Sequence, residues 1–287
     1  MKNNNEAKGE NWTTVLEAQR TWFDLNLLEL WRYRDLIFLF VRRDLVAIYK
    51  QTILGPLWYL LQPLFATVVF TVIFGEIARI PTDGLPPALF YMTGIVVWNY
   101  FSGCVTSTSD TFVTNAAIFG KVYFPRLVVP LSTVISNMLT FFVQLVLLLG
   151  FSGYFYFKGA PIQPTMWLLL MPALIIHMAA LGLGTGIFIS SLTTKYRDLT
   201  FAIGFCVQLW MYATPVVYPI SQVPEKWQWL ISLNPMTAIV ESFRYALLGK
   251  GTLDFGLIGM SITITLIILA IGVTLFGRIE KTFMDTV

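Results

Sequence analysis

The chain has 287 residues, of which 56% are hydrophobic and 12% are charged, and its formal net charge is +3. Soluble domains carry about 25% charged residues, so this composition offers too little polar side-chain area to cover a water-exposed surface. It excludes a soluble enzyme or a nucleic-acid-binding domain and predicts a protein that crosses a membrane several times.

The first 50 residues divide into two parts. Residues 1–26 form a polar tail of mixed charge that lacks the apolar core and cleavage site of a signal peptide. Residues 27–50 mix apolar and aromatic side chains with basic ones, among them Arg42, Arg43 and Lys50. The charges interrupt this segment too often for a buried span, so we expect an amphipathic helix in the membrane interface. A helix packed on a soluble partner is the alternative.

Six apolar stretches follow, and each is long enough for the roughly 20 residues that a helix needs to cross the hydrocarbon. They predict an all-α transmembrane domain over residues 51–277 with six spans. A β-barrel is excluded because the stretches are long and do not alternate in polarity. The expected spans lie at about 54–76, 88–109, 128–155, 166–193, 199–219 and 255–277.

Basic residues indicate how the spans are oriented. The N-terminal segment, residues 110–126, residues 195–198 and the C-terminal residues 278–287 together carry 14 of the 19 Lys and Arg residues. Because cytoplasmic loops are enriched in Lys and Arg, both termini are expected in the cytoplasm.

The first cytoplasmic connection, residues 110–130, contains apolar residues spaced three or four apart, such as Phe112, Ala116 and Phe119. This spacing predicts a short helix, and Pro125 and Pro130 close the stretch that contains it. We expect this helix to be the place where another subunit pushes on the chain.

The connection between the last two expected spans is long, covering residues 220–254. Asn234 is a plausible N-cap, Pro235 suits the first helical position, and Gly249 suits the residue after a helix end. We expect two short amphipathic helices on the outer side, either interfacial or re-entrant into the outer leaflet, with Trp227, Trp229, Phe243 and Tyr245 at the interface level.

Few side chains in the sequence could act in catalysis or bind a metal. Glu241 and Arg244 are three residues apart and can pair on one helix face, for which a structural role is the simpler interpretation. His177 is the only histidine and is expected to be hydrogen-bonded inside the protein rather than to bind a metal. We expect no metal site, no catalytic residue and no cofactor in this chain.

Glycines within the fourth span resemble a dinucleotide fingerprint only superficially, because no strand precedes them. Gly182 and Gly186 instead predict close packing between helices. A nucleotide-binding P-loop motif is absent from the sequence, and the spans lack the carboxylates of a proton-driven transporter. Energy for uphill transport would therefore come from a partner.

Aromatic residues make up 15% of the chain and gather in the first, second and fifth spans. They could line a path for sugar rings, which share the apolar face and polar edge of Tyr and Trp. Composition alone favours lipid-facing or interfacial belts. The residues concerned are Trp58, Tyr59, Phe65, Phe70, Trp98, Tyr100, Trp210 and Tyr212.

Several segments, in order along the chain, resemble the membrane subunit of type-2 ABC exporters, in the branch that exports O-antigen, capsule and teichoic acid polysaccharides. The resemblance covers nearly the whole chain after residue 30. The segments are YKQTILGPLWYLLQPL (49–64), FYMTGIVVWNYF (90–101), KVYFPRLVVPLS (121–132), KYRDL (195–199), TPVVYP (214–219) and NPMTAIVESFRYALLG (234–249).

This resemblance implies a half-transporter in the bacterial cytoplasmic (inner) membrane. Two copies of the chain would form a homodimer around a central path, and two copies of a cytoplasmic ATPase subunit would bind ATP and Mg. The cargo would be a polysaccharide linked to undecaprenyl diphosphate. An exporter of a drug or a small lipid remains the alternative, and a membrane-embedded enzyme is a third class that lacks its carboxylate or histidine cluster.

The resemblance also implies roles for particular residues. The helix of residues 111–120 matches the family's coupling helix, for which we expect contacts from Thr111, Phe112, Asn115, Ile118, Phe119 and Lys121. The aromatic residues given above would line the channel. An outer gate would include Trp227, Trp229, Glu241, Phe243 and Arg244.

The N-terminal interfacial helix matches the family's cytoplasmic gate. Arg42, Arg43 and Lys50 are candidates for binding the lipid diphosphate. The alternative for these three is the general basic bias of cytoplasmic segments and contact with anionic lipid. The polar tail of residues 1–26 matches no motif of the family. Two alternatives remain for it, namely disorder and docking to the ATPase subunit.

Overall fold

The computed structural model describes residues 27–51, 53–196 and 198–286, so the expected polar tail lies outside the described residues. The described part of the chain is helical and contains no strand, which confirms the all-α class. The helices are α1 (Leu27–Arg32), α2 (Arg34–Gln51), α3 (Trp58–Phe70), α4 (Pro87–Ser109), α5 (Thr111–Phe119), α6 (Val128–Phe157), α7 (Met171–Thr193), α8 (Leu199–Tyr212), α9 (Glu225–Ser232), α10 (Pro235–Leu248) and α11 (Phe255–Thr286).

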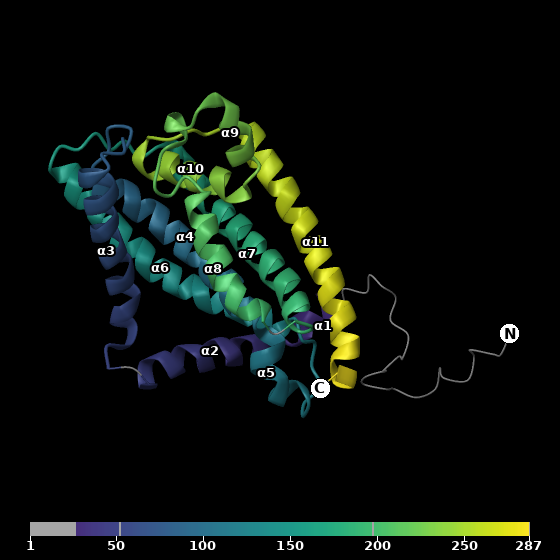
Figure 1. Ribbon diagram of the computed structural model, residues 1–287. Helices are drawn as coiled ribbons and strands as arrows, with labels where there is room; N and C mark the ends of the chain where they lie inside the picture. Colours follow the sequence, from purple (N-terminus) through teal and green to yellow (C-terminus); the bar gives the residue numbers. More distant parts are fainter. Residues whose placement is uncertain (1–26, 52, 197, 287) are drawn as a thin grey trace, which may run out of the picture.

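The long helices run between two ends of the molecule (Figure 1). Helices α1, α2 and α5 lie at one end, together with the C-terminal end of α11, and we call this the α2–α5 end. Helices α9 and α10 lie at the other, the α9–α10 end. Among the described residues, five stretches are long and apolar enough to cross a membrane, namely Gly55–Ile77, Pro87–Ser109, Val128–Phe157, Met166–Thr193 and Phe255–Glu280.

The fifth expected span, residues 199–219, differs from the structure. Its helix, α8, ends at Tyr212 and has 14 residues, which at 1.5 Å per residue is about 21 Å, short of the roughly 30 Å of hydrocarbon. The chain leaves the helix before Pro215, where a proline disfavours helical backbone in the preceding residue. Helix α8 nevertheless runs from the α2–α5 end toward the α9–α10 end (Figure 1).

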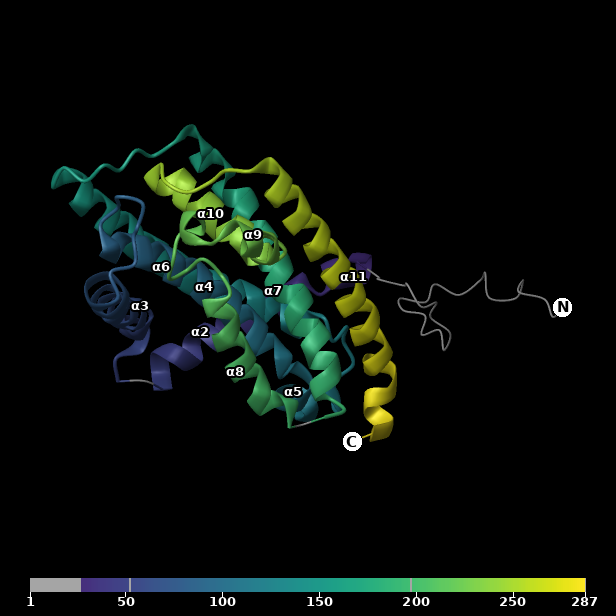
Figure 2. The same cartoon turned by 45° about the horizontal axis from the view of Figure 1, so that its top comes forward.

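Helix α4 lies at the centre of the bundle. In its apolar window 78% of the residues are buried, against 11–33% in the four other candidate spans. Figure 2 shows α4 with α6 on one side and α7 on the other, while α3 and α11 lie at the flanks. The flanking helices therefore keep apolar faces that the described chain does not cover.

Glycines allow α7 to approach two neighbours closely. A Cβ added at Gly182 would lie 2.7 Å from the Cβ of Cys104, and one at Gly186 would lie 2.6 Å from the Cβ of Thr108. These contacts confirm the close packing expected from the two glycines, and the partner is α4. Gly184, between them, faces Leu269 of α11, with 2.9 Å from an added Cβ to the Leu269 Cα.

Helix α10 begins and ends as its sequence predicts. The side chain of Asn234 accepts a hydrogen bond from the Met236 backbone N–H at 3.1 Å, and Pro235 occupies the first turn. Gly249 follows the helix with φ of +70°, a left-handed conformation that glycine adopts without strain. A Cβ at this position would also collide with the Gln163 carbonyl.

Candidate functional site

Helix α5 has a buried face and an exposed face. Four of the expected coupling residues lie on the buried face, namely Thr111, Phe112, Asn115 and Phe119, and Ile118 is half-buried. The exposed side of this segment is formed by Val113, Thr114, Ala117, Gly120 and Lys121. Of the six proposed residues, Lys121 is thus the one that is fully available to a partner.

Aromatic rings hold the buried face of α5 against the rest of the protein. The ring centroids of Phe112 and Phe276 in α11 are 4.6 Å apart. On the other side, Phe119 packs on Phe124 at 5.7 Å, and Phe124 packs on Phe40 of α2 at 5.8 Å. A displacement of α5 would therefore also displace the side chains of α2 and α11 that pack against these rings.

Polar contacts add to this connection. The backbone N–H of Arg126 donates to Oε1 of Glu280 at 3.1 Å, and the Arg126 guanidinium donates to the Glu280 carbonyl oxygen. Burial lowers the pKa of Arg126, and the Glu280 carboxylate opposes this effect. At the corner between α4 and α5, burial raises the pKa of the Asp110 carboxyl. A hydrogen bond with the Thr200 hydroxyl lowers this pKa and partly offsets the effect of burial.

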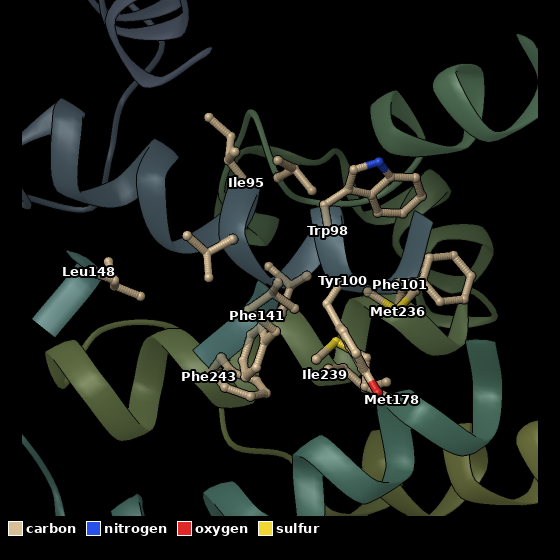
Figure 3. Close-up of a cluster of buried hydrophobic side chains, with 14 of the residues drawn as sticks. Ile95, Trp98, Tyr100, Phe101, Phe141, Leu148, Met178, Met236, Ile239 and Phe243 are labelled. Atoms are coloured by element: carbon tan, nitrogen blue, oxygen red, sulfur yellow. The ribbon is translucent and has the colours of Figure 1, made fainter. Parts of the chain in front are cut away.

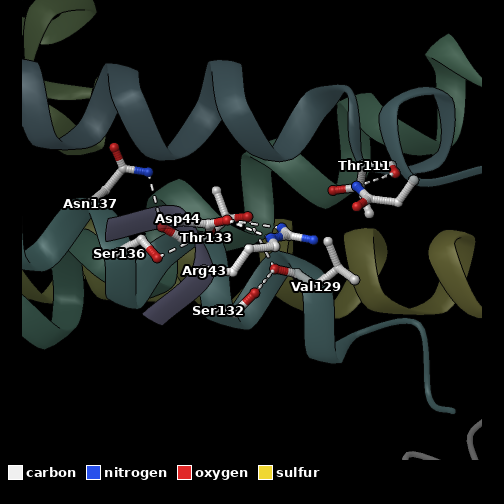
Figure 4. Close-up of polar contacts among 9 residues, drawn as sticks. Arg43, Asp44, Thr111, Val129, Ser132, Thr133, Ser136 and Asn137 are labelled. Carbon is white, nitrogen blue, oxygen red and sulfur yellow. Dashed lines mark hydrogen bonds and ion pairs between the residues drawn. The ribbon is translucent and has the colours of Figure 1, made fainter. Parts of the chain in front are cut away.

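Helix α2 lies across the end of the bundle, with Arg42, Arg43 and Lys50 exposed (Figure 1). Arg43 pairs with Asp44 at 2.9 Å and lies 4.7 Å from the centroid of the Phe40 ring. Oδ2 of Asp44 accepts a hydrogen bond from Ser136 of α6 at 3.3 Å, as Figure 4 shows. Arg43 is thus held in place by the fold, while its neighbour Arg42 projects from the surface.

The eight aromatic residues proposed for a channel occupy different environments. Trp98 and Tyr100 of α4 are 4% and 3% exposed and pack inside the core, as Figure 3 shows. Trp210 of α8 is half-buried, with ring centroids 5.1 Å from Phe101. Trp58, Phe65 and Tyr212 are exposed, and Tyr59 and Phe70 are half-buried.

The residues proposed for an outer gate separate into two groups. Trp227 and Trp229 of α9 are exposed, at 50% and 61%. Glu241, Phe243 and Arg244 of α10 are no more than 2% exposed. The members of the second group face the protein interior and hold α10 in place.

The guanidinium of Arg244 makes the densest set of polar contacts in α10. It pairs with Glu241 at 3.1 Å, donates to the carbonyl oxygens of Pro215 and Val216, and lies 3.7 Å from the centroid of the Phe90 ring. Glu241 also accepts a hydrogen bond from the Thr252 backbone N–H at 3.2 Å. The pair thereby joins α10 to α4 and to the loops that follow α8 and α10.

His177 has the interior hydrogen bonds expected of it. Its Nε2 lies 3.0 Å from the Thr265 hydroxyl and 3.3 Å from the Ser261 hydroxyl, both of α11. Ser261 in turn donates to the Pro235 carbonyl at 2.8 Å. This contact set connects α7 and α11 with the start of α10.

A polar cavity that was not predicted from the sequence lies near the α2–α5 end, between α2, α3, α4, α5 and α6, with a volume of about 560 Å³. Its signal was present in the sequence as polar residues spaced three or four apart within two apolar spans, such as Asn99 and Ser102 in α4 and Asn137 and Thr140 in α6.

Comparison with known proteins adds to this geometry. A family model described as "ABC-2 type transporter" matches residues 35–248. The O-antigen export system permease protein RfbA of Klebsiella pneumoniae is 29% identical over 251 residues, which cover 88% of this chain and 94% of that protein. RfbA of Myxococcus xanthus is 29% identical over 75% of this chain and 81% of its own. The polysialic acid transport protein KpsM of Escherichia coli is 21% identical over 81% of this chain and 89% of its own.

Proposed function

This chain belongs to the ABC-2 type transporter family, and we propose on that premise that it is the channel-forming permease subunit of an ATP-driven polysaccharide exporter. It is a multi-pass protein of the bacterial inner membrane. The cargo in this proposal is a glycan linked to undecaprenyl diphosphate, of the O-antigen, capsule or teichoic acid type. The observation that carries it is the similarity to O-antigen export permeases over most of both chains.

In this proposal the chain itself hydrolyses nothing. Two copies form a homodimer, and two copies of a separate cytoplasmic ATPase subunit bind ATP and Mg. The ATPase docks on the exposed side of α5, where Val113, Ala117 and Lys121 are available. The buried residues Phe112 and Phe119 then transmit its movement to α11 and α2.

Closure of the ATPase dimer would bias a two-state packing between the two permease copies, which is the element such coupling needs. The diphosphate of the lipid would be drawn to the basic surface of α2, where Arg42 and Lys50 are exposed. Helix α8 would make the sixth crossing, with its short helix continued by the non-helical residues 213–219, so that both termini lie in the cytoplasm.

Deletion of the gene from its native host and complementation test this function. Restoration of surface glycan by this chain, together with copurification of an ATPase subunit, is the expected result. The matched control is a transporter whose ATPase lacks its P-loop lysine, which should assemble but leave the glycan inside the cell. Unchanged surface glycan in the deletion strain, with altered drug sensitivity, would instead indicate a drug or small-lipid exporter.

A further inference from the structure

The polar cavity is built by two facing helix stripes. On α4, Asn99, Ser102, Gly103 and Thr106 recur at intervals of three or four residues and therefore share one face. The same face continues to Ser107, close to the end of the helix. None of these side chains is charged, and each of the polar ones can both donate and accept hydrogen bonds.

Helix α6 supplies the opposite stripe. The residues of α6 that line the cavity recur at intervals of three or four, and they are Thr133, Asn137, Thr140 and Gln144. Figure 4 shows two of them, Thr133 and Asn137. Gln144 is 4% exposed and lies in the middle of an apolar span. A buried amide at this depth costs free energy unless it is hydrogen-bonded. Across the cavity, Oε1 of Gln144 accepts a 3.5 Å hydrogen bond from the Asn99 amide.

The charge of the cavity indicates what it binds. The described side chains that line it include two charged ones, Arg43 and Asp44, and these pair with each other at 2.9 Å. The lining is therefore neutral overall, which disfavours a diphosphate and suits an uncharged ligand rich in hydroxyl groups. Arg42, which is exposed on α2 and does not line the cavity, remains available for a phosphate outside it.

The size and the lining of the cavity agree with this ligand class. A volume of about 560 Å³ falls within the range of roughly 300–1,000 Å³ that small-molecule pockets occupy. Tyr59 of α3 adds an aromatic face to the lining, on which the C–H face of a sugar ring can pack. Gly103 lets the Asn137 amide approach α4 closely, because a Cβ at residue 103 would lie 2.8 Å from Oδ1 of Asn137 and would displace this amide.

We propose that this cavity holds the uncharged sugar next to the diphosphate of the lipid-linked cargo, so that each copy of the permease recognises the start of a glycan within its own helix bundle. This inference rests on the proposed function, and it adds a binding site inside one copy to the path between two copies. The amides of Asn99, Asn137 and Gln144 exchange hydrogen bonds with the sugar hydroxyls, and the diphosphate lies at the mouth beside α2.

Lipid binding to the complete transporter, permease with its ATPase in nanodiscs, tests this site. The two probes are undecaprenyl diphosphate and undecaprenyl diphosphate that carries one N-acetylglucosamine. The wild-type transporter should bind the sugar-bearing lipid about tenfold more tightly, because several hydrogen bonds to buried amides contribute. Gln144→Leu and Gly103→Ala should reduce this preference to about twofold or less while affinity for the bare lipid stays unchanged.

Gly150→Ala is the matched control, since Gly150 also lies in α6 and an added Cβ meets no atom within 4 Å. It should keep the wild-type preference. Equal binding of the two lipids by the wild-type transporter would overturn the proposal, as would a preference that both cavity variants retain. If surface glycan is still restored in the complementation test, such a result removes this cavity alone and leaves the proposed function standing.

Discussion

At the scale of single residues, Arg244 shows how an interaction predicted from spacing becomes a larger contact set. Its pairing with Glu241, three residues earlier, is confirmed at 3.1 Å. The carbonyl oxygens of Pro215 and Val216 and the ring of Phe90 come from segments far away in the sequence. A buried guanidinium needs such partners, because an uncompensated charge at 1% exposure is strongly destabilising.

We predict that Arg244→Gln lowers the free energy of unfolding by about 3–5 kcal/mol, because it leaves Glu241 as a buried charge without its partner. Arg244→Lys should not restore stability, since an ammonium group cannot reach two carbonyls and a carboxylate in the fork geometry of arginine. Thermal unfolding of the purified protein in detergent measures both effects. Lys226→Gln, at an exposed position of the neighbouring helix α9, is the control. If Arg244→Gln keeps the thermal stability of the wild type but loses export, the Glu241–Arg244 pair is instead a gate contact that changes during transport.

At the scale of helices, the three-to-four spacing of residues 111–120 correctly predicted a short helix but did not indicate which face would be covered. The structure buries Phe112 and Phe119 and leaves Val113 and Ala117 exposed. Both faces combine apolar and polar residues, so their composition does not distinguish a contact within the chain from a contact with a partner subunit. The contacts with α11 and α2 decide which face of α5 is buried in the protein and which face is left for a partner.

This division predicts opposite effects for two variants of α5. Ala117→Arg, on the exposed face, should leave thermal stability unchanged and abolish copurification with the ATPase subunit. Phe112→Ala should cost about 3–5 kcal/mol of stability, because it leaves a void beside Phe276. Thermal unfolding and pull-down of the ATPase measure the two effects side by side. Retention of the ATPase by Ala117→Arg would show that the partner docks elsewhere.

At the scale of the whole molecule, the arrangement of the helices agrees with the bias in basic residues. Helices α2 and α5 and the end of α11 lie together at one end, and α9 and α10 lie at the other (Figure 1). The basic bias assigns the α2–α5 end to the cytoplasm. In this orientation, the exposed side of α5 and the loop before α9 are in different compartments.

This arrangement predicts the outcome of a cysteine-labelling experiment. In a background with Cys104→Ala and Cys206→Ala, a membrane-impermeant maleimide added to spheroplasts should label Gln222→Cys, before α9. Ala117→Cys should react after the inner membrane is permeabilised and not before. Both positions are exposed in this chain, and the permease is expressed without its ATPase subunit so that no partner covers residue 117. A difference in labelling then reports the compartment. Labelling of Ala117→Cys in intact spheroplasts would place α5 on the wrong side for a partner in the cytoplasm.

The sequence by itself determined the features that local geometry encodes. The lengths of five candidate spans, the Asn234 cap, the turn at Gly249 and the close packing at Gly182 and Gly186 all follow from composition, backbone preferences or spacing within one helix. These predictions needed no knowledge of which helices are neighbours. The helix of the fifth expected span ends at Tyr212, before the expected end at residue 219, although the apolar composition continues past Tyr212.

The tertiary structure decided which side of each helix faces protein. Trp98 is buried and Phe65 is 61% exposed, although both are aromatic residues within apolar spans. In water, an apolar side chain signals a buried face, but lipid is as apolar as the protein interior, so hydrophobicity no longer reports burial in a span. Only the packing of α4 between α6 and α7 separates core residues from surface residues, and only the meeting of α4 with α6 turns two polar stripes into one cavity.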